Sequence, residues 1–187
     1  MKVYGVTGGA GSGKSEVLKI LENEFNFCVI LSDDVTRALQ KKGNVSYELI
    51  VEHFGKEVLL EDGELDRKKI AAKVFGDPEE LEALNSFTHP QTMDAIRATI
   101  RIEQELGERA GIALETALMF ESGANELCDE VWYVYSKPEI RRERMKASRG
   151  YSDEKVDAVM ANQKADEFFF ENCGFIIENN GSLDDVR

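Results

Sequence analysis

The sequence predicts an α/β fold of three layers, in which helices flank a parallel sheet of five strands. Two observations predict it. Short apolar runs recur along the 187 residues, with stretches of helical spacing between them. The first run leads directly into a glycine-rich loop and a helix, an order typical of sheets that bind ligands at the carboxyl ends of their strands. The strands are expected at Val3–Thr7, Phe27–Leu31, Ile112–Thr116, Val131–Tyr135 and Phe175–Ile177.

The glycine-rich loop has the pattern G-x-x-x-x-G-K-S of a phosphate-binding loop, or P-loop. Its glycines permit positive φ angles, so that backbone N–H groups and the start of the next helix surround phosphate oxygens. Lys14 is expected to reach the outer phosphates of ATP, and Ser15 Oγ to bind Mg²⁺. The predicted ATP-binding residues are Gly8, Gly9, Ala10, Gly11, Ser12, Gly13, Lys14, Ser15 and Glu16.

A long helical insertion separates the second and third strands. The gap of about 80 residues is far longer than one crossover helix needs. We expect the insertion, at about 36–107, to hold a second substrate; the alternative is a purely structural flank. His89-Pro90 is expected to begin a helix, because proline is favoured in a first turn. The helical patterns are Thr36–Lys42, Tyr47–Phe54, Arg67–Phe75, Glu79–Phe87 and Gln91–Leu106.

A smaller insertion follows the fourth strand and is expected to form a lid at about 137–171. Residues 137–149 hold six basic and two acidic residues, in a chain whose net charge is −13. Basic, mobile segments over a phosphate site exclude water and neutralise charge; the alternative is a solvated helix face. A single unit is therefore expected over 1–187, with a core at about 1–35, 108–136 and 172–187.

The composition limits the partners of the chain. Its negative charge disfavours nucleic acid and anionic membranes, including a nucleic-acid-dependent ATPase activity. No apolar run is long enough to cross a membrane, and the early P-loop leaves no room for a signal peptide. Three widely spaced cysteines suit a reducing compartment. We expect a cytoplasmic protein with a small-molecule substrate, either a monomer or a weak homo-oligomer.

Acidic residues follow two of the predicted strands. Asp33 and Asp34 come after Phe27–Leu31, and Glu115 follows the apolar run Ile112-Ala113-Leu114. One of the two aspartates is expected to be the base for an attacking hydroxyl, although either also suits a helix N-cap. Glu115 is expected to reach Mg²⁺ through water. Asn162, Gln163 and 179–182 are candidate neighbours of the adenine, by their position after late strands.

Several segments, taken in order, match the motifs of one known enzyme family along nearly the whole chain. Ser32–Arg37 is similar to its Asp-Ala-Asp-x-x-x-Arg segment, and Leu118–Glu121 is similar to its Leu-Leu-Phe-Glu segment. Further matches lie at the P-loop, Leu65-Asp66-Arg67, Val74-Phe75, His89-Pro90 and Asn179–Leu183. In these segments the chain resembles bacterial dephospho-coenzyme A kinases. Leu31, Glu16 and Ala117 depart from the family's Asp, Thr and Pro.

The resemblance implies a P-loop kinase that moves the γ-phosphate of ATP to the ribose 3′-hydroxyl of dephospho-coenzyme A. It implies Asp33 as the base. Lys14, Arg144 and Arg149 are the expected catalytic cations. The expected acceptor-binding residues are Arg37, Arg67, His89 and Glu121. Two alternatives stand beside it: a kinase for a nucleoside or nucleotide, and a non-catalytic ATP-binding homologue.

Overall fold

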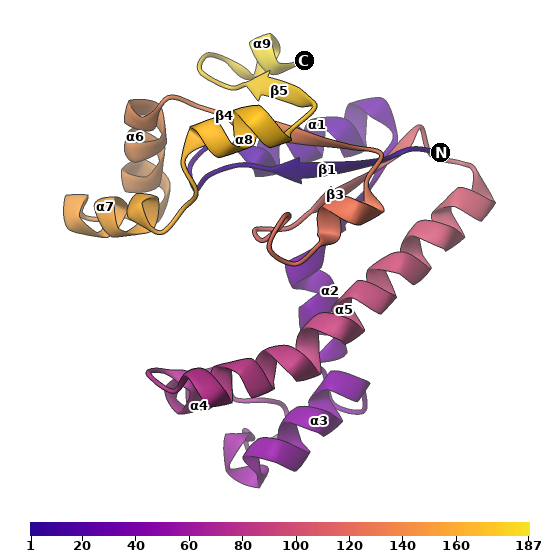
Figure 1. Cartoon of the computed structure of the whole chain (residues 1–187), viewed down its shortest axis with the longest axis vertical. Coiled ribbons are helices and arrows are strands. Elements are labelled where there is room, and N and C mark those ends of the chain that lie inside the picture. Colours follow the sequence, from indigo (N-terminus) through magenta and orange to yellow (C-terminus); the bar gives the residue numbers. More distant parts are fainter. The chain divides into compact units, whose positions relative to one another are not determined.

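The computed structural model describes residues 1–187 and divides into two compact units (Figure 1). Unit 1 comprises Met1–Ile30 and Glu103–Arg187, and unit 2 comprises Leu31–Ile102. In chain order the elements are β1 (Val3–Thr7), α1 (Lys14–Phe25), β2 (Phe27–Leu31), α2 (Ser32–Leu39), α3 (Val45–Phe54), η1 (Lys56–Val58), α4 (Arg67–Val74), α5 (Pro78–Leu106), β3 (Gly111–Glu115), η2 (Ala124–Leu127), β4 (Glu130–Tyr135), α6 (Pro138–Arg149), α7 (Asp153–Ala161), α8 (Asp166–Asn172), β5 (Phe175–Glu178) and α9 (Leu183–Val186).

A five-stranded sheet of order β2-β3-β1-β4-β5 organises unit 1, which confirms the predicted α/β fold. β1 pairs in parallel with β3 and β4, and β4 pairs in parallel with β5. The inner strands are buried along most of their length, as continuous apolar runs in a parallel sheet should be. The register sets Val6 beside Glu115 and Thr7 beside Tyr133. The ends of β3 and β4 therefore flank the loop that follows β1.

Unit 2 is helical and has an apolar core of its own. Side chains from α3, η1 and α4 form it, together with partly buried residues of α5 such as Leu84 and Phe87. The connection before α4 ends at Asp66, whose carboxylate accepts hydrogen bonds from the backbone N–H groups of Lys68 and Lys69. That cap fixes the start of α4 at Arg67. The buried core residues are Tyr47, Ile50, Phe54, Val58, Leu65 and Ile70.

The predicted helix start at His89-Pro90 is wrong, because α5 runs without a break from Pro78 to Leu106. Proline has no N–H and breaks one helical hydrogen bond. The helix nevertheless continues, since its buried residues Thr88, Thr92, Ile96 and Ile100 recur every four positions on both sides of Pro90. Pro90 itself is exposed. Burial of one continuous face therefore overrides the local preference of proline.

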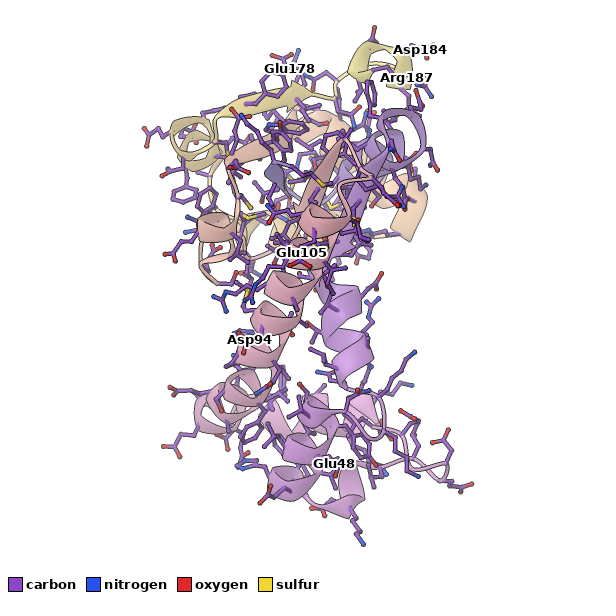
Figure 2. The ribbon with its side chains drawn as sticks, turned by 90° about the vertical axis from the view of Figure 1, so that its right-hand side faces the viewer. Glu48, Asp94, Glu105, Glu178, Asp184 and Arg187 are labelled. Atoms are coloured by element: carbon purple, nitrogen blue, oxygen red, sulfur yellow. The ribbon has the colours of Figure 1, made fainter.

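Charged side chains cover both units (Figure 2). The labelled Glu48 and Asp94 are exposed on unit 2, and Glu105 and Glu178 are exposed on unit 1. None of the helices is both long enough and apolar enough to span a lipid bilayer.

Candidate active site

The P-loop connects β1 to α1 in unit 1, as the sequence predicts. Gly11 and Gly13 have φ angles of 79° and 90°, in the left-handed region that favours glycine. A Cβ atom at Gly11 would also collide with the backbone of Arg141, and one at Gly13 with the side chain of Asn179. No side chain caps the start of α1 at Lys14. The first N–H groups of α1 are therefore available to an anionic ligand.

Side chains outside the loop hold its carbonyl groups. The Ser12 carbonyl accepts hydrogen bonds from Asn179 Nδ2 at 2.8 Å, Ser136 Oγ at 3.1 Å and Arg144 Nη1 at 3.4 Å. Arg144 Nη1 also donates to Ser136 Oγ at 3.0 Å. Three donors from the ends of β4 and β5 and from α6 thus converge on one carbonyl, which fixes the loop before a ligand enters.

Lys14 lies within this cradle, and its Nζ donates to the Gly8 carbonyl at 2.7 Å. Burial lowers the pKa of Lys14. The carboxylate of Glu115 acts in the opposite direction, whereas the positive charges of Arg149 and Arg141 lower the pKa further. Positive charges that lower the pKa of a buried lysine disfavour its charged form. Phosphate oxygens would stabilise each of these positive charges, so the cluster is suited to an anionic ligand.

In unit 2, α2 places the two candidate bases differently. Its N-cap is Leu31, so Asp33 and Asp34 lie in the first turn and neither serves as the cap. Asp34 Oδ1 accepts a hydrogen bond from Arg37 Nη1 at 3.0 Å. Asp33 is exposed and makes no hydrogen bond or ion pair within unit 2. The two carboxylates are neighbours in sequence, but only that of Asp33 is unengaged.

Unit 2 also contains a basic cavity of about 470 Å³. Arg37 and Arg67 line it together, and Lys41 adds a third positive charge beside the single carboxylate of Glu64. Two of the four predicted acceptor residues therefore share one cavity. The other two do not line it: His89 is exposed on α5, and Glu121 lies in unit 1, where it pairs with Lys164 at 3.3 Å.

Comparison with known proteins decides between the kinase classes. A family model described as dephospho-CoA kinase matches residues 2–185. The chain belongs to the dephospho-CoA kinase family. It is 36% identical over 187 residues to the dephospho-CoA kinase of Carboxydothermus hydrogenoformans, an alignment that covers 100% of this chain and 90% of the relative. It is 37% identical to that of Symbiobacterium thermophilum, with 100% and 77% covered. The chain is thus a kinase, and ATP is its phosphate donor.

Solved structures agree with this family. The dephospho-CoA kinase of Campylobacter jejuni is 27% identical, with a TM-score of 0.74 over 99% of this chain and 91% of the other. A structure from Thermus thermophilus is 30% identical, with a TM-score of 0.81 and coverage of 99% and 92%. A shikimate kinase from Acinetobacter baumannii, 13% identical at a TM-score of 0.51, shares the fold alone; it covers 97% of this chain and 86% of that kinase.

The residues present fit a Mg²⁺ ion, which accompanies ATP in phosphoryl transfer. Ser15 is exposed in the first turn of α1, and Glu115 acts on the charge of Lys14 from the end of β3. No group of three or more metal-ligating residues gathers in the structure. One hydroxyl and one carboxylate suit Mg²⁺, which in phosphoryl-transfer sites completes its coordination with substrate phosphates and water.

The basic residues of α6 divide between different faces of the helix. Arg142 forms ion pairs with Asp153 and Asp157 of α7, so it joins two helices rather than facing the P-loop. Arg149 is exposed at the end of α6, with its guanidinium 5.8 Å from the ring centroid of Tyr151. Arg144 faces the loop but binds protein carbonyl and hydroxyl groups, as described above.

Arg141 contacts the P-loop, although the sequence did not single it out within the basic cluster. The spacing between Arg141 and the apolar Met145 is the sequence feature that could have identified it. Arg141 and Met145 are one helical turn apart and are both buried, whereas Lys137 and Arg149 on either side are exposed. A basic residue on the apolar stripe of a helix is a stronger candidate for a site than its exposed neighbours. Ser136, whose hydroxyl donates to the Ser12 carbonyl, is a second residue of the site that no sequence pattern marks.

Proposed function

We propose that this chain transfers the γ-phosphate of ATP to the ribose 3′-hydroxyl of dephospho-CoA, the last step of coenzyme A synthesis. The observation that carries the proposal is the P-loop itself, preorganised by its anchored carbonyls in a chain of the dephospho-CoA kinase family. Phosphoryl transfer requires positioning and charge neutralisation more than covalent chemistry, and a rigid cradle of N–H groups beside Lys14 supplies both.

Asp33 is the proposed base. Its carboxylate is exposed and unengaged within unit 2, while the neighbouring Asp34 already accepts a hydrogen bond from Arg37. A free carboxylate can accept the proton of an attacking hydroxyl, whereas one held by a guanidinium is a weaker base. The structure thereby favours one of the two aspartates that the sequence left open.

The basic cavity of unit 2 is the proposed site for the anionic part of the acceptor. Dephospho-CoA carries a diphosphate, and guanidinium groups bind phosphate through paired N–H donors. Arg37 and Arg67 offer two guanidinium groups around one cavity, and Lys41 adds an ammonium group. His89 and Glu121 remain proposed acceptor contacts from the family resemblance, and both are exposed.

Around the phosphates, Lys14 is proposed to neutralise charge on the outer oxygens, with Arg144 and Arg149 assisting from α6. Ser15 and, through water, Glu115 are the proposed holders of Mg²⁺. When bound, that ion stabilises the negative charge of the transferred phosphoryl group. The nucleotide is proposed to bind to the core and to the lid at about 137–171, and the acceptor to the insertion at about 36–107.

The cytoplasm is the proposed compartment, which the three free thiols support. The proposed assembly is a monomer or weak homo-oligomer.

Asp33→Asn tests the base, and Asp34→Asn is its matched control. We expect Asp33→Asn to lower kcat with dephospho-CoA by about 10²- to 10⁴-fold, because the hydroxyl loses its proton acceptor. The Kd for ATP should stay within about threefold, because Asp33 belongs to unit 2 whereas the P-loop belongs to unit 1. Coupled ADP-release assays and calorimetry measure the two quantities.

Asp34→Asn should keep kcat within about tenfold of the wild type. The assignment of Asp33 fails if Asp34→Asn abolishes turnover while Asp33→Asn retains it.

A panel of nucleosides and nucleotides, assayed beside dephospho-CoA, tests the acceptor. The proposed acceptor is wrong if a nucleotide, and not dephospho-CoA, stimulates ADP release.

A further inference from the structure

Arg141 is a buried cation beside the P-loop that the phosphoryl-transfer scheme above does not use. Its side chain is only 6% exposed, although α6 is otherwise rich in exposed charges. Its guanidinium covers Gly9 so closely that a Cβ atom there would collide with it. Burying a guanidinium is unfavourable unless strong partners surround it, so the contacts of Arg141 define its role.

Those contacts join the loop to a turn far along the chain. Arg141 Nε donates to the Ala10 carbonyl at 3.1 Å. Nη2 donates to Gln163 Oε1, and Nη1 lies 3.4 Å from Asp166 Oδ1. Gln163 and Asp166 bracket the turn between α7 and α8. One side chain thus connects the P-loop, α6 and the 163–166 turn.

Asp166 is itself held in place from the sheet. Tyr133 Oη donates to Asp166 Oδ1 at 2.6 Å. Burial raises the pKa of Tyr133, and the hydrogen bond to Asp166 raises it further, so this donor stays protonated over the working pH range. The network therefore has a fixed end in β4 and a fixed end at Ala10, with Arg141 between them.

This arrangement serves the loop in two ways. The carbonyl of Ala10 must point away from the phosphates if the neighbouring N–H groups are to point toward them, and Arg141 holds that carbonyl. Arg141 also adds a positive charge near enough to Lys14 to lower its pKa. Asp166 Oδ1 lies 3.4 Å from Arg141 Nη1 and also accepts a hydrogen bond from Tyr133, and an anionic ligand in the loop would add a further partner for the buried cation.

We propose that Arg141 is a positioning residue of the nucleotide site, which clamps the Ala10 carbonyl to the 163–166 turn and thereby couples triphosphate affinity to the placement of that turn. The proposal rests on the assignment of the P-loop as the ATP site. Its test separates the two claims, because the wild-type protein must bind ATP before any variant is informative.

The test compares Arg141→Met, Arg141→Lys and Asp166→Asn, with Arg109→Met as the control. Arg109 is an exposed arginine of unit 1 that donates to Asn26 Oδ1 at 3.0 Å and does not contact the loop. Kd values for ATP and AMP are measured by calorimetry, and KM and kcat are measured with both substrates. The fluorescence of Trp132, the single tryptophan, reports folding of unit 1.

We expect Arg141→Met to raise the Kd and KM for ATP by roughly 10- to 100-fold, as loss of a charge-assisted hydrogen bond at a site does. The Kd for AMP should rise less, and the KM for dephospho-CoA and kcat should change less than about threefold. Arg141→Lys should bind ATP more tightly than Arg141→Met but more weakly than the wild type. The Kd for ATP of Asp166→Asn should lie between those of Arg141→Lys and the wild type. Arg109→Met should match the wild type.

The proposal is overturned if Arg141→Met binds ATP within about threefold of the wild type, or if its loss is equal for ATP and AMP. If Arg141→Met does not fold, the two milder variants decide: wild-type ATP affinity in both overturns the proposal, and weakened ATP affinity in folded protein supports it. A wild-type protein that does not bind ATP instead overturns the proposed function.

Discussion

At the scale of single residues, Lys14 shows how burial and neighbouring charges act on a lysine of the P-loop. Its ammonium group is buried near the positive charges of Arg149 and Arg141, and only the Gly8 carbonyl and the charge of Glu115 favour it. Burial lowers its pKa, which means that the fold without a ligand disfavours the charged form. A phosphate-binding loop of this kind is therefore arranged for its ligand rather than for stability.

This arrangement predicts a pH dependence of stability. Since the pKa of Lys14 is lower in the folded than in the unfolded chain, the unfolded chain binds more protons between the two values. The contribution of Lys14 to the free energy of unfolding should therefore rise as the pH rises toward its ordinary pKa of 10.5. Urea unfolding between pH 7 and 10, compared for wild type and Lys14→Met, measures it.

Lys14→Met removes the titrating group, so the difference in unfolding free energy between the two proteins should move in favour of the wild type as the pH rises. A difference that stays constant, or moves the other way, contradicts the assigned burial of Lys14. The variant should also lose ATP affinity at every pH.

At the scale of elements, α5 shows a helix that continues through a residue that normally ends one. Pro90 is exposed, while Thr88 and Thr92 on either side of it are buried. The hydroxyl of Thr88 donates to the Leu84 carbonyl at 3.0 Å, one turn earlier. Packing of the buried face therefore carries the helix past the missing N–H of Pro90, at a cost of about 3 kcal/mol for an interior proline.

Pro90→Ala should raise the free energy of unfolding by about 1 to 2 kcal/mol. The substitution restores a backbone hydrogen bond, and this gain exceeds the cost of the larger conformational entropy of the unfolded chain. Urea unfolding followed by circular dichroism at 222 nm measures the change. Pro78→Ala is the matched control, since Pro78 is the first residue of α5 and its missing N–H breaks no helical bond. Equal effects of the two substitutions would contradict this explanation.

At the scale of the whole molecule, positive charge gathers in two places in a chain of net charge −13. One is the P-loop with Lys14, Arg141 and Arg144 in unit 1. The other is the cavity with Arg37 and Arg67 in unit 2. An acidic protein repels anions in general, so local clusters of cations determine where anionic substrates bind. The proposed function assigns one anionic substrate to each cluster.

Arg67→Ala should raise the KM for dephospho-CoA by roughly 10-fold, with the Kd for ATP unchanged, because Arg67 belongs to the cavity and not to the P-loop. Arg97→Ala is the control: Arg97 is exposed in the same unit, and it pairs with Asp94 at 2.9 Å outside the cavity. Steady-state kinetics at two salt concentrations measures both variants. A loss of ATP affinity in Arg67→Ala would contradict the division of the substrates.

Much of the fold could be predicted because its signals are local. β1, the loop from Gly8 to Ser15 and α1 are contiguous, and each is recognisable from its own residues. The family resemblance depended on ordered segments in the same way. Local reasoning fails at Pro90. A rule about proline in a first turn predicted a helix start there, whereas burial of one face of α5 continues the helix through this residue.

The sequence by itself determined the α/β fold, the P-loop and the kinase family of this protein, because apolar runs, glycine spacing and ordered motifs act over a few neighbouring residues. Only the tertiary structure decided which of two adjacent aspartates is unengaged, and which arginine of a basic run is buried against the loop. Those choices depend on contacts such as that between Arg141 and Ala10, which join residues 131 positions apart. Hydrogen bonds over such separations exist only once the chain has folded, so no local pattern records them.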